Sequence, residues 1–250
     1  MSGWQLRREE LADPASAASN PRQAAQWVLA AAAEGDLEAQ ALLGQLLLDG
    51  HGIERDPALA LTWFKLAARR GHLMARNMLG RCHEHGWGCA ADLPAAAGHY
   101  RQAAAAGLDW GLYNYANLLA TGRGVAQDQS AALACYRRAA SLGHAKSMNL
   151  LGRYLEQGLG VPAAPAEAHA WYRRAAEAGD FRGMFSHALV LAEAGQAAEA
   201  DVWLSRAKAA GHTAFLRHSL ATLQGAGAAL AAQAQGYAEE IQRREHSPLT

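Results

Sequence analysis

Residues 36–71 read DLEAQALLGQLLLDGHGIERDPALALTWFKLAARRG, and this thirty-six-residue pattern returns along most of the 250-residue chain. Its first half carries apolar residues at helical spacing, which predicts a helix with one packed face. A glycine pair, Gly50 and Gly52, ends that helix. Asp56-Pro57 begins a second helix, because aspartate is a favoured N-cap and proline suits the first helical position. The stretch therefore predicts a helical hairpin.

Helix-closing glycines mark the period of this hairpin. They stand thirty-six residues apart at Gly35, Gly71, Gly107, Gly143 and Gly179. A fixed period of this size indicates stacked copies of one supersecondary unit, since one hairpin cannot bury its own apolar face. A small residue recurs with the same period, where we expect two helices to approach closely: Gly44, Gly80, Ala116 and Gly152.

The repeated pattern A…LG…G-x-G-(V/I)…D…A…W-(F/Y)-(K/R)-x-A-A…G resembles the Sel1-like repeat family, a relative of the tetratricopeptide repeats. The resemblance implies an all-α fold, a right-handed α-solenoid (superhelix) of stacked antiparallel helix hairpins. It divides the chain into a half-repeat at 20–35, repeats at 36–71, 72–107, 108–143 and 144–179, a degenerate repeat at 180–211, and the first helix of a last unit at 212–225. We expect the solenoid to span 20–227, between a flexible segment at 1–19 and a capping helix at 228–245.

Composition excludes several classes of protein. A hydrophobic content of 51% with 18% charged residues excludes a disordered chain. The 23 Lys and Arg balance 23 Asp and Glu, so a nucleic-acid partner is not expected. No apolar run approaches the ~20 residues of a membrane span, and residues 1–13 contain no signal-peptide core. Cys82, Cys89 and Cys135 lack the spacing of a disulfide framework, so we expect a cytoplasmic protein.

The sequence contains no recognisable catalytic constellation of the Ser-His-Asp, Cys-His-Asn or paired-carboxylate kind. We therefore expect a protein that is not an enzyme and needs no cofactor. Three histidines each follow a helix-closing glycine, and we interpret them as caps of the next helix: His72, His144 and His212. Cations recur on the second helices at Lys65, Arg101, Arg137 and Arg173, where they complement the helix dipole.

The first helices carry the expected binding residues. By analogy with tetratricopeptide repeats, they line a concave groove. Their exposed positions differ between repeats, while the packed positions keep the same type of residue. Trp110 and Tyr113 are three residues apart, so they lie side by side and offer apolar area with polar tips. The alternative for Trp110 is packing against a neighbouring helix. The expected contact residues are Met74, Asn77, Arg81, Trp110, Tyr113, Asn117, Lys146, Asn149, Arg153, Arg182 and Phe185.

These residues favour a non-enzymatic protein–protein interaction module, an adaptor or scaffold. The aromatic pair would hold an apolar anchor, and the cations would hold acidic groups or a free carboxylate of a peptide or protein partner. A self-associating structural protein is another interpretation, and the partner and the oligomeric state stay open.

A metal-binding or redox protein is the interpretation from another class. Its candidate ligands are Cys82, His83, His85, Cys89 and His99, the densest such cluster in the chain. The repeat columns favour packing instead, because His83 stands where Leu47 stands and His99 where Trp63 stands. A disulfide between Cys82 and Cys89 is also open.

Overall fold

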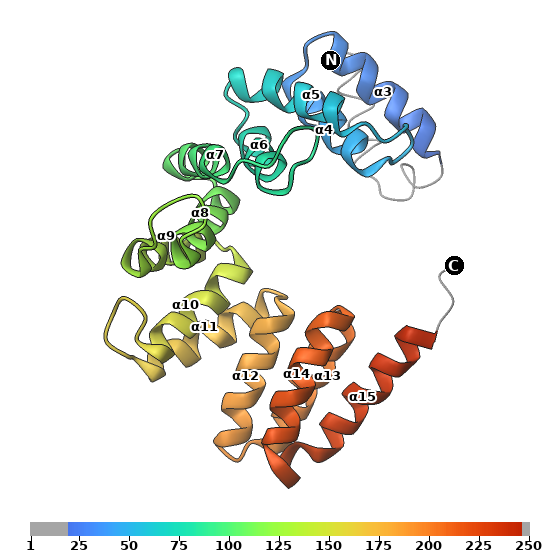
Figure 1. Ribbon diagram of the computed structural model, residues 1–250. Helices are drawn as coiled ribbons and strands as arrows, with labels where there is room; N and C mark the ends of the chain where they lie inside the picture. Colours follow the sequence, from blue (N-terminus) through green and yellow to red (C-terminus); the bar gives the residue numbers. More distant parts are fainter. Residues whose placement is uncertain (1–19, 247–250) are drawn as a thin grey trace. The chain divides into compact units, whose positions relative to one another are not determined.

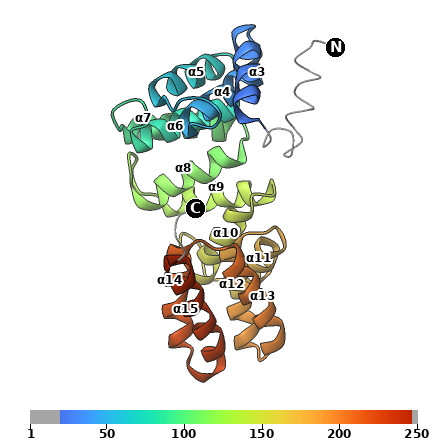
Figure 2. The same cartoon turned by 90° about the vertical axis from the view of Figure 1, so that its right-hand side faces the viewer.

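Short helices follow one another along the whole described part of the chain, residues 20–246 of a computed structural model (Figures 1 and 2). This part contains thirteen α-helices and one 3-10 helix, and consecutive helices pack together in pairs. The prediction of an all-helical chain of repeated hairpins is confirmed. None of the helices between residues 20 and 246 has the length and apolar content of a membrane span. The segment 1–19, which we expected to be flexible, lies outside the described residues.

The helices belong to two compact units, residues 1–135 and 136–250. The first unit contains α3 (Pro21–Ala33), α4 (Leu37–Asp49), α5 (Pro57–Arg69), α6 (Leu73–His85), α7 (Leu93–Ala105) and α8 (Asp109–Thr121), and the division falls within α9 (Gln129–Ser141). The second unit contains α10 (Ala145–Gln157), α11 (Pro165–Glu177), α12 (Phe181–Glu193), α13 (Ala197–Ala210), α14 (Thr213–Gly225), the 3-10 helix η1 (Gly227–Leu230) and α15 (Ala231–His246).

Side-chain caps begin most of these helices. Asp56 Oδ1 accepts a hydrogen bond from the backbone N–H of Leu59, with 2.9 Å between the two atoms. His72 caps α6 with its imidazole, since the Ala75 nitrogen lies 2.9 Å from His72 Nδ1. Two further histidines cap α10 and α14 in the same way, His144 and His212. The interpretation of these histidines as caps is confirmed, and each satisfies a backbone donor that the helix leaves unpaired.

The paired glycines shape the turn inside each hairpin. Gly50 ends α4 in the left-handed conformation, with φ of 73°. Gly52 follows with φ of 72°, and a Cβ atom there would collide with the Pro21 carbonyl. The turn of one hairpin thus packs against the start of the preceding second helix, which only glycine permits.

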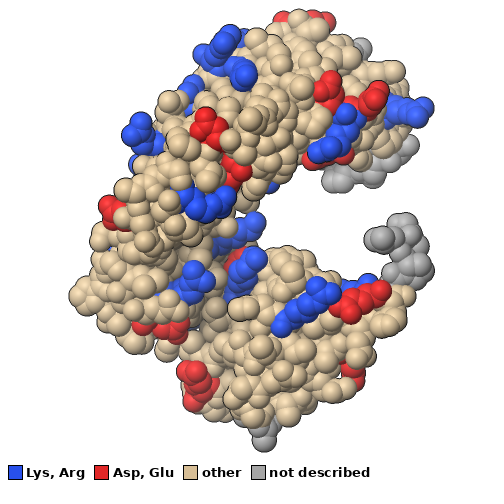
Figure 3. All heavy atoms as spheres, in the orientation of Figure 1, with Lys and Arg blue, Asp and Glu red and all other residues tan. Residues whose placement is uncertain are grey.

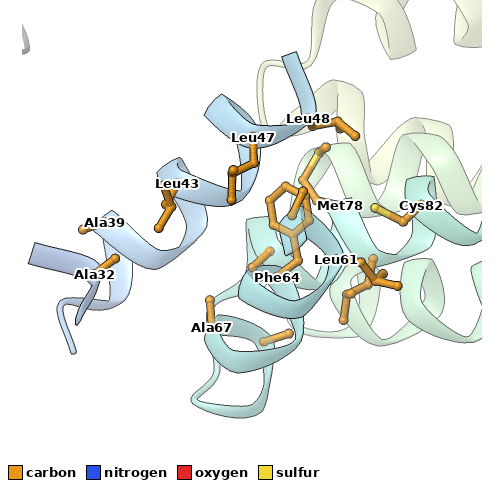
Figure 4. Packing of buried hydrophobic residues seen from close by; sticks show 14 of the residues in the cluster. Ala32, Ala39, Leu43, Leu47, Leu48, Leu61, Phe64, Ala67, Met78 and Cys82 are labelled. Atoms are coloured by element: carbon orange, nitrogen blue, oxygen red, sulfur yellow. The ribbon is translucent and has the colours of Figure 1, made fainter. Parts of the chain in front are cut away.

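The core lies between the two helices of each hairpin and the helix that follows (Figure 4). Leu43 and Leu47 of α4, Phe64 of α5 and Met78 of α6 belong to one buried cluster, in which Leu47 and Met78 lie on either side of the Phe64 ring. Phe64 is 1% exposed, and burial of such a ring stabilises the fold by about 2–3 kcal/mol. A Cβ atom at Gly44 would lie 2.6 Å from that ring, so the expected close approach at this column is confirmed.

The second unit ends in an amphipathic helix. Ala234, Tyr237 and Ile241 of α15 are buried among residues of α12, α13 and α14, and α14 and α15 lie side by side (Figure 2). The Tyr237 hydroxyl donates a hydrogen bond of 2.9 Å to the Leu204 carbonyl. Because Gly227–Leu230 forms a 3-10 turn, the α-helix begins at Ala231 and not at residue 228.

Candidate partner-binding surface

In the first unit, three large apolar side chains of the first helices are open to solvent: Leu42 of α4, which is 41% exposed, and two residues at equivalent repeat positions. Met74 of α6 is 37% exposed, and Trp110 of α8, thirty-six residues later, is 36% exposed. The rings of Trp110 and Tyr113 meet edge to face with centroids 6.0 Å apart, as their spacing predicts. Trp110 is therefore accessible at the surface, although the sequence left a packed position open. The partly exposed side chains of Arg81, Tyr113 and Asn117 belong to the same helices.

Arg81 contacts an aromatic ring in this unit. Its guanidinium lies 4.9 Å from the centre of the Trp87 ring, which projects from the turn after α6. This cation–π contact holds the charge near the apolar turn. Trp87 was absent from the residues that the sequence suggested, because its turn position is occupied by other residue types in the other repeats.

Two of the expected contact residues are buried, and here the sequence-based expectation is wrong. Asn77 is 2% exposed and Asn149 is 8% exposed. Asn77 Oδ1 accepts a hydrogen bond of 2.9 Å from the Asn114 amide on α8. Asn149 Oδ1 accepts one of 3.1 Å from the Ser186 hydroxyl on α12. Their column faces the first helix of the next repeat, so these amides join neighbouring repeats and are not available to a partner.

The spacing of these pairs in the sequence is a sign that the two asparagines bond to the next repeat. Each acceptor is followed thirty-seven residues later by its polar donor. Buried polar groups need such partners, since an unpaired one costs about 1–3 kcal/mol. Polar residues thirty-seven positions apart, on the first helices of neighbouring repeats, identify Asn114 and Ser186 as these partners.

The second unit presents cations on its first helices. Lys146 and Arg153 of α10 and Arg182 of α12 are exposed. Arg182 lies 4.6 Å from the centre of the Phe181 ring. Arg153 and Arg182 form no ion pair with any residue between 20 and 246. These positive charges are thus available to an acidic group.

Phe185 has a more structural position than we expected. It is half-buried on α12, and its ring centroid lies 5.8 Å from that of Phe215 and 6.3 Å from that of Tyr237. Phe185 therefore packs in the apolar cluster under α15, with only part of its ring accessible.

Charges of both signs are interspersed over the surface. On the face that Figure 3 shows, Lys and Arg lie among Asp and Glu and do not merge into one basic area. This distribution agrees with the zero net charge, and it lacks the basic footprint of a nucleic-acid-binding surface on that face.

The cysteine and histidine cluster in the first unit is packed. Cys89 Sγ lies 3.7 Å from His83 Nδ1, and the His83 and His99 rings stack with centroids 5.4 Å apart. His85 stands apart from them and contacts Trp87, with 4.6 Å between ring centroids. Within residues 20–246, no three His, Cys, Asp or Glu side chains converge in a way that could hold a metal ion.

Cys82 and Cys89 supply the two thiols of this cluster. Cys82 is fully buried, and burial raises the pKa of its thiol to about 11, so the thiol stays protonated at neutral pH. Cys82 and Cys89 are both free thiols, so the disulfide that the sequence left open between them is not formed. Burial also lowers the pKa of His99, whose Nδ1 is buried without a hydrogen-bond partner among the described residues.

The comparisons with known proteins identify the repeat. A family model described as Sel1 repeat matches residues 15–36, 37–72, 73–108, 111–144 and 145–180, which together make up more than half of the chain. No match was found among curated proteins. Sel1 repeat proteins are usually non-catalytic, and no enzyme family was detected.

Solved structures have the same fold. A Sel1 repeat protein from Oxalobacter formigenes is 25% identical, with a TM-score of 0.79 over 99% of this chain and 100% of that one. A protective antigen present in uropathogenic Escherichia coli strains, displaying an SLR fold, is 24% identical, with a TM-score of 0.56 over 96% of this chain and 60% of that one. An immunity protein from Pseudomonas aeruginosa is 22% identical, with a TM-score of 0.50 over 66% of this chain and 61% of that one. Together with the five matched repeats and the helix pairs described above, these findings show that the chain belongs to the Sel1 repeat family.

Proposed function

We propose that this protein is a non-enzymatic adaptor or scaffold that binds another protein through exposed side chains of its first helices. Sel1 repeats typically mediate protein interactions, which supports the class of function. The residues that carry the proposal differ between the units: Met74, Trp110 and Tyr113 in the first, and Lys146, Arg153 and Arg182 in the second.

One observation carries most of the argument. Trp110 is an exposed tryptophan, 36% accessible, that is held edge-on by Tyr113, with Met74 exposed at the equivalent position one repeat earlier. Tryptophan and tyrosine dominate the binding energy of protein interfaces, because they bury large areas with few rotatable bonds. Rigid helices present these side chains, so binding does not require the surface to order itself.

The cations of the second unit indicate which charge the partner is expected to carry. Arg153 and Arg182 have no ion pair within the described residues, and their guanidinium groups can bind a carboxylate in a bidentate manner. The partner is therefore expected to carry both an apolar anchor and acidic residues. A nucleic acid would offer charge but not the aliphatic anchor that Met74 and Trp110 suit.

A photo-crosslinking experiment tests the assignment. A benzophenone amino acid is placed at Trp110, and for comparison at Leu59, an apolar residue of α5 that is slightly more exposed (43% accessible). We expect the first to capture a specific protein and the second not to. With the captured partner purified, Trp110→Ala should weaken binding at least tenfold, while Leu59→Ala leaves the Kd unchanged. Equal effects of the two substitutions would overturn the assignment.

The acidic character of the partner has its own test. Arg153→Glu combined with Arg182→Glu should slow association and reduce its salt dependence, whereas Arg173→Glu on the second helix α11 should not. Sedimentation at increasing protein concentration identifies the case in which the partner is a second copy of this chain.

We also place the protein in the cytoplasm, on the ground that Cys82 and Cys89 form no disulfide. Cell fractionation with an antibody against the chain tests this assignment, and recovery with a periplasmic or secreted fraction contradicts it.

A further inference from the structure

A pocket recurs in the first unit on a side of the helices that the proposed function does not use. One copy of it, of about 260 Å³, lies between α3 and the turn after α4 and is lined by Arg22, Ala25, Gln26, Leu29, Gly52 and Ile53. Another, of about 150 Å³, lies between α7, α8 and the turn after α8 and is lined by Pro94, Ala97, Gly98, Arg101, Tyr115 and Val125. The four α3 positions and Ile53 of the first pocket each return seventy-two residues later in the second. Gly124, the equivalent of Gly52, is not among the residues that line the second pocket.

The packing of the turns creates these pockets. A Cβ atom at Gly124 would lie 2.5 Å from the Leu93 carbonyl, so the turn after α8 rests directly on the start of α7. The next turn of α7 then forms one wall and Val125 another. The pocket is therefore built from backbone contacts that the repeat requires, and only its lining side chains are free to vary.

The lining of the α7 pocket is chemically distinct from that of its counterpart. Arg101 stands at the position of Leu29, so a guanidinium replaces an alkyl group. Tyr115 adds a phenol on the α8 side. Neither the Arg101 guanidinium nor the Tyr115 hydroxyl forms a hydrogen bond or an ion pair with another residue in the described part of the chain. Two unpaired donors therefore line one pocket together with apolar residues.

Gly98 keeps this pocket open. It lies in the middle of α7, where glycine is less favourable than alanine. A Cβ atom there would meet no atom within 4 Å, and the backbone does not adopt positive φ. Neither packing nor conformation requires the glycine, and the equivalent positions carry side chains, Thr62, Ala134 and Ala170. Its effect on the surface is the space that it leaves beside Arg101.

We propose that the pocket lined by Gly98, Arg101 and Tyr115 binds a carboxylate attached to a compact apolar group. The guanidinium and the phenol both donate hydrogen bonds and suit the two carboxylate oxygens. Pro94, Ala97 and Val125 supply the apolar walls. A volume of about 150 Å³ is the space that a benzene ring fills in a protein.

This site is independent of the surface assigned to a protein partner. Tyr115 and Tyr113 are two residues apart on one helix, which places their side chains about 200° apart around its axis. The partner-binding surface can therefore fail its test while the carboxylate site holds, and the reverse.

Benzoate is the probe, and amide chemical shifts of the isotope-labelled full chain are the measurement. We expect benzoate to shift the amide signals of Gly98, Arg101 and Val125 saturably, while Gly52 and Ile53 in the counterpart pocket serve as an internal control. Benzamide, which has the same shape and no charge, should shift them far less. Arg101→Gln should weaken benzoate binding about tenfold, the loss expected when one charge-assisted hydrogen bond is removed. Gly98→Leu should abolish binding by filling the pocket.

A second arm distinguishes a free acid from the end of a polypeptide. Acetyl-glycyl-phenylalanine is compared with its amide and with benzoate. Tighter binding of the peptide acid indicates a partner's C-terminus, and tighter binding of benzoate indicates a free small acid; both support the site. The proposal is overturned if benzoate leaves Gly98 unshifted, if benzamide acts equally, or if Arg101→Gln leaves the Kd unchanged while circular dichroism shows an intact fold.

Discussion

The Tyr100 hydroxyl donates a hydrogen bond of 2.8 Å to Oε2 of Glu84, which joins the two helices of the α6–α7 hairpin. Arg123, in the turn of the next repeat, lies 3.1 Å from the other carboxylate oxygen of Glu84. Burial and this hydrogen bond raise the pKa of the Tyr100 phenol, so it remains a donor throughout the neutral range. Tyr172 and Glu156 repeat the pair in the second unit at 2.8 Å.

The Tyr100–Glu84 pair should behave as one energetic unit. The first hairpin has Phe64 and Leu48 at the equivalent positions, a purely apolar version of the same contact. We expect Tyr100→Phe alone to lower the free energy of unfolding by about 1–2 kcal/mol, because Glu84 loses a donor. Combining it with Glu84→Leu should cost less than the sum of the single changes. Urea denaturation of the four proteins gives the coupling energy, and a value near zero contradicts the prediction.

The buried asparagines should matter for stability and not for binding. Asn77→Ala leaves the partly buried Asn114 amide without its acceptor, so we expect a loss of about 1–3 kcal/mol in unfolding free energy. Asn117→Ala, at a partly exposed position of α8, should cost less than about 0.5 kcal/mol. Thermal unfolding of both variants measures the difference, and equal losses would show that burial does not separate the two residues.

Replacing either of two helical glycines with alanine should change the stability of the protein, in opposite directions at the two positions. Gly98→Ala adds a methyl group into open space and improves helix propensity, so it should stabilise the protein by about 0.5–1 kcal/mol. Gly80→Ala drives a methyl group into the Tyr100 ring, so it should destabilise the protein by about 1–3 kcal/mol. Chemical denaturation checks both variants. A destabilised Gly98→Ala protein would mean that the pocket beside Arg101 is closed in solution.

His187 should make the protein sensitive to acid. Burial is the main cause and lowers the pKa of His187. The charges of Arg173 and His169 also lower this pKa, whereas the carboxylates of Glu199 and Glu177 raise it. Below the ordinary histidine pKa of 6.5, the unfolded chain binds a proton that the folded chain does not, so stability falls as the pH falls. His187→Leu, which restores the residue type of Leu43 and Leu151, should flatten this dependence between pH 7 and about pH 5.

Stability should also rise in that variant at neutral pH, since the buried His187 Nδ1 lacks a hydrogen-bond partner among the described residues. His99, whose pKa burial also lowers, keeps part of the pH dependence in place. Unfolding curves at several pH values measure the effect. An unchanged slope in His187→Leu would show that His187 titrates normally in the folded state.

Cys82 should resist alkylation. Burial raises the pKa of its thiol to about 11, and the residue has no accessible surface, so the reactive thiolate is both scarce and shielded. At pH 8, iodoacetamide should modify the partly exposed Cys89 and Cys135 first, and Cys82 only when urea unfolds the protein. Peptide mass spectrometry after timed quenching gives the order, and early labelling of Cys82 contradicts it.

The helices and their ends could be predicted from the sequence because their causes are local. Asp56 and Pro57 start a helix through contacts within four residues, and Gly50 ends one through its own backbone conformation. The thirty-six-residue period extends this reasoning from one hairpin to the stack, since identical columns must pack in the same way. Even the close approach at Gly44 was visible as a small residue in a repeated column.

The candidate sites depended on contacts between repeats, which a single hairpin does not contain. Asn77 and Trp110 both occupy varying columns of first helices, yet the neighbouring helix covers Asn77 and leaves Trp110 open. Arg101 and Tyr115 come from different helices and meet in one pocket only because the turn after α8 rests on α7. Local hydrogen bonding and periodic burial therefore determined the helices from the sequence alone, whereas the distance between neighbouring helices decided which polar side chains are buried, paired or accessible.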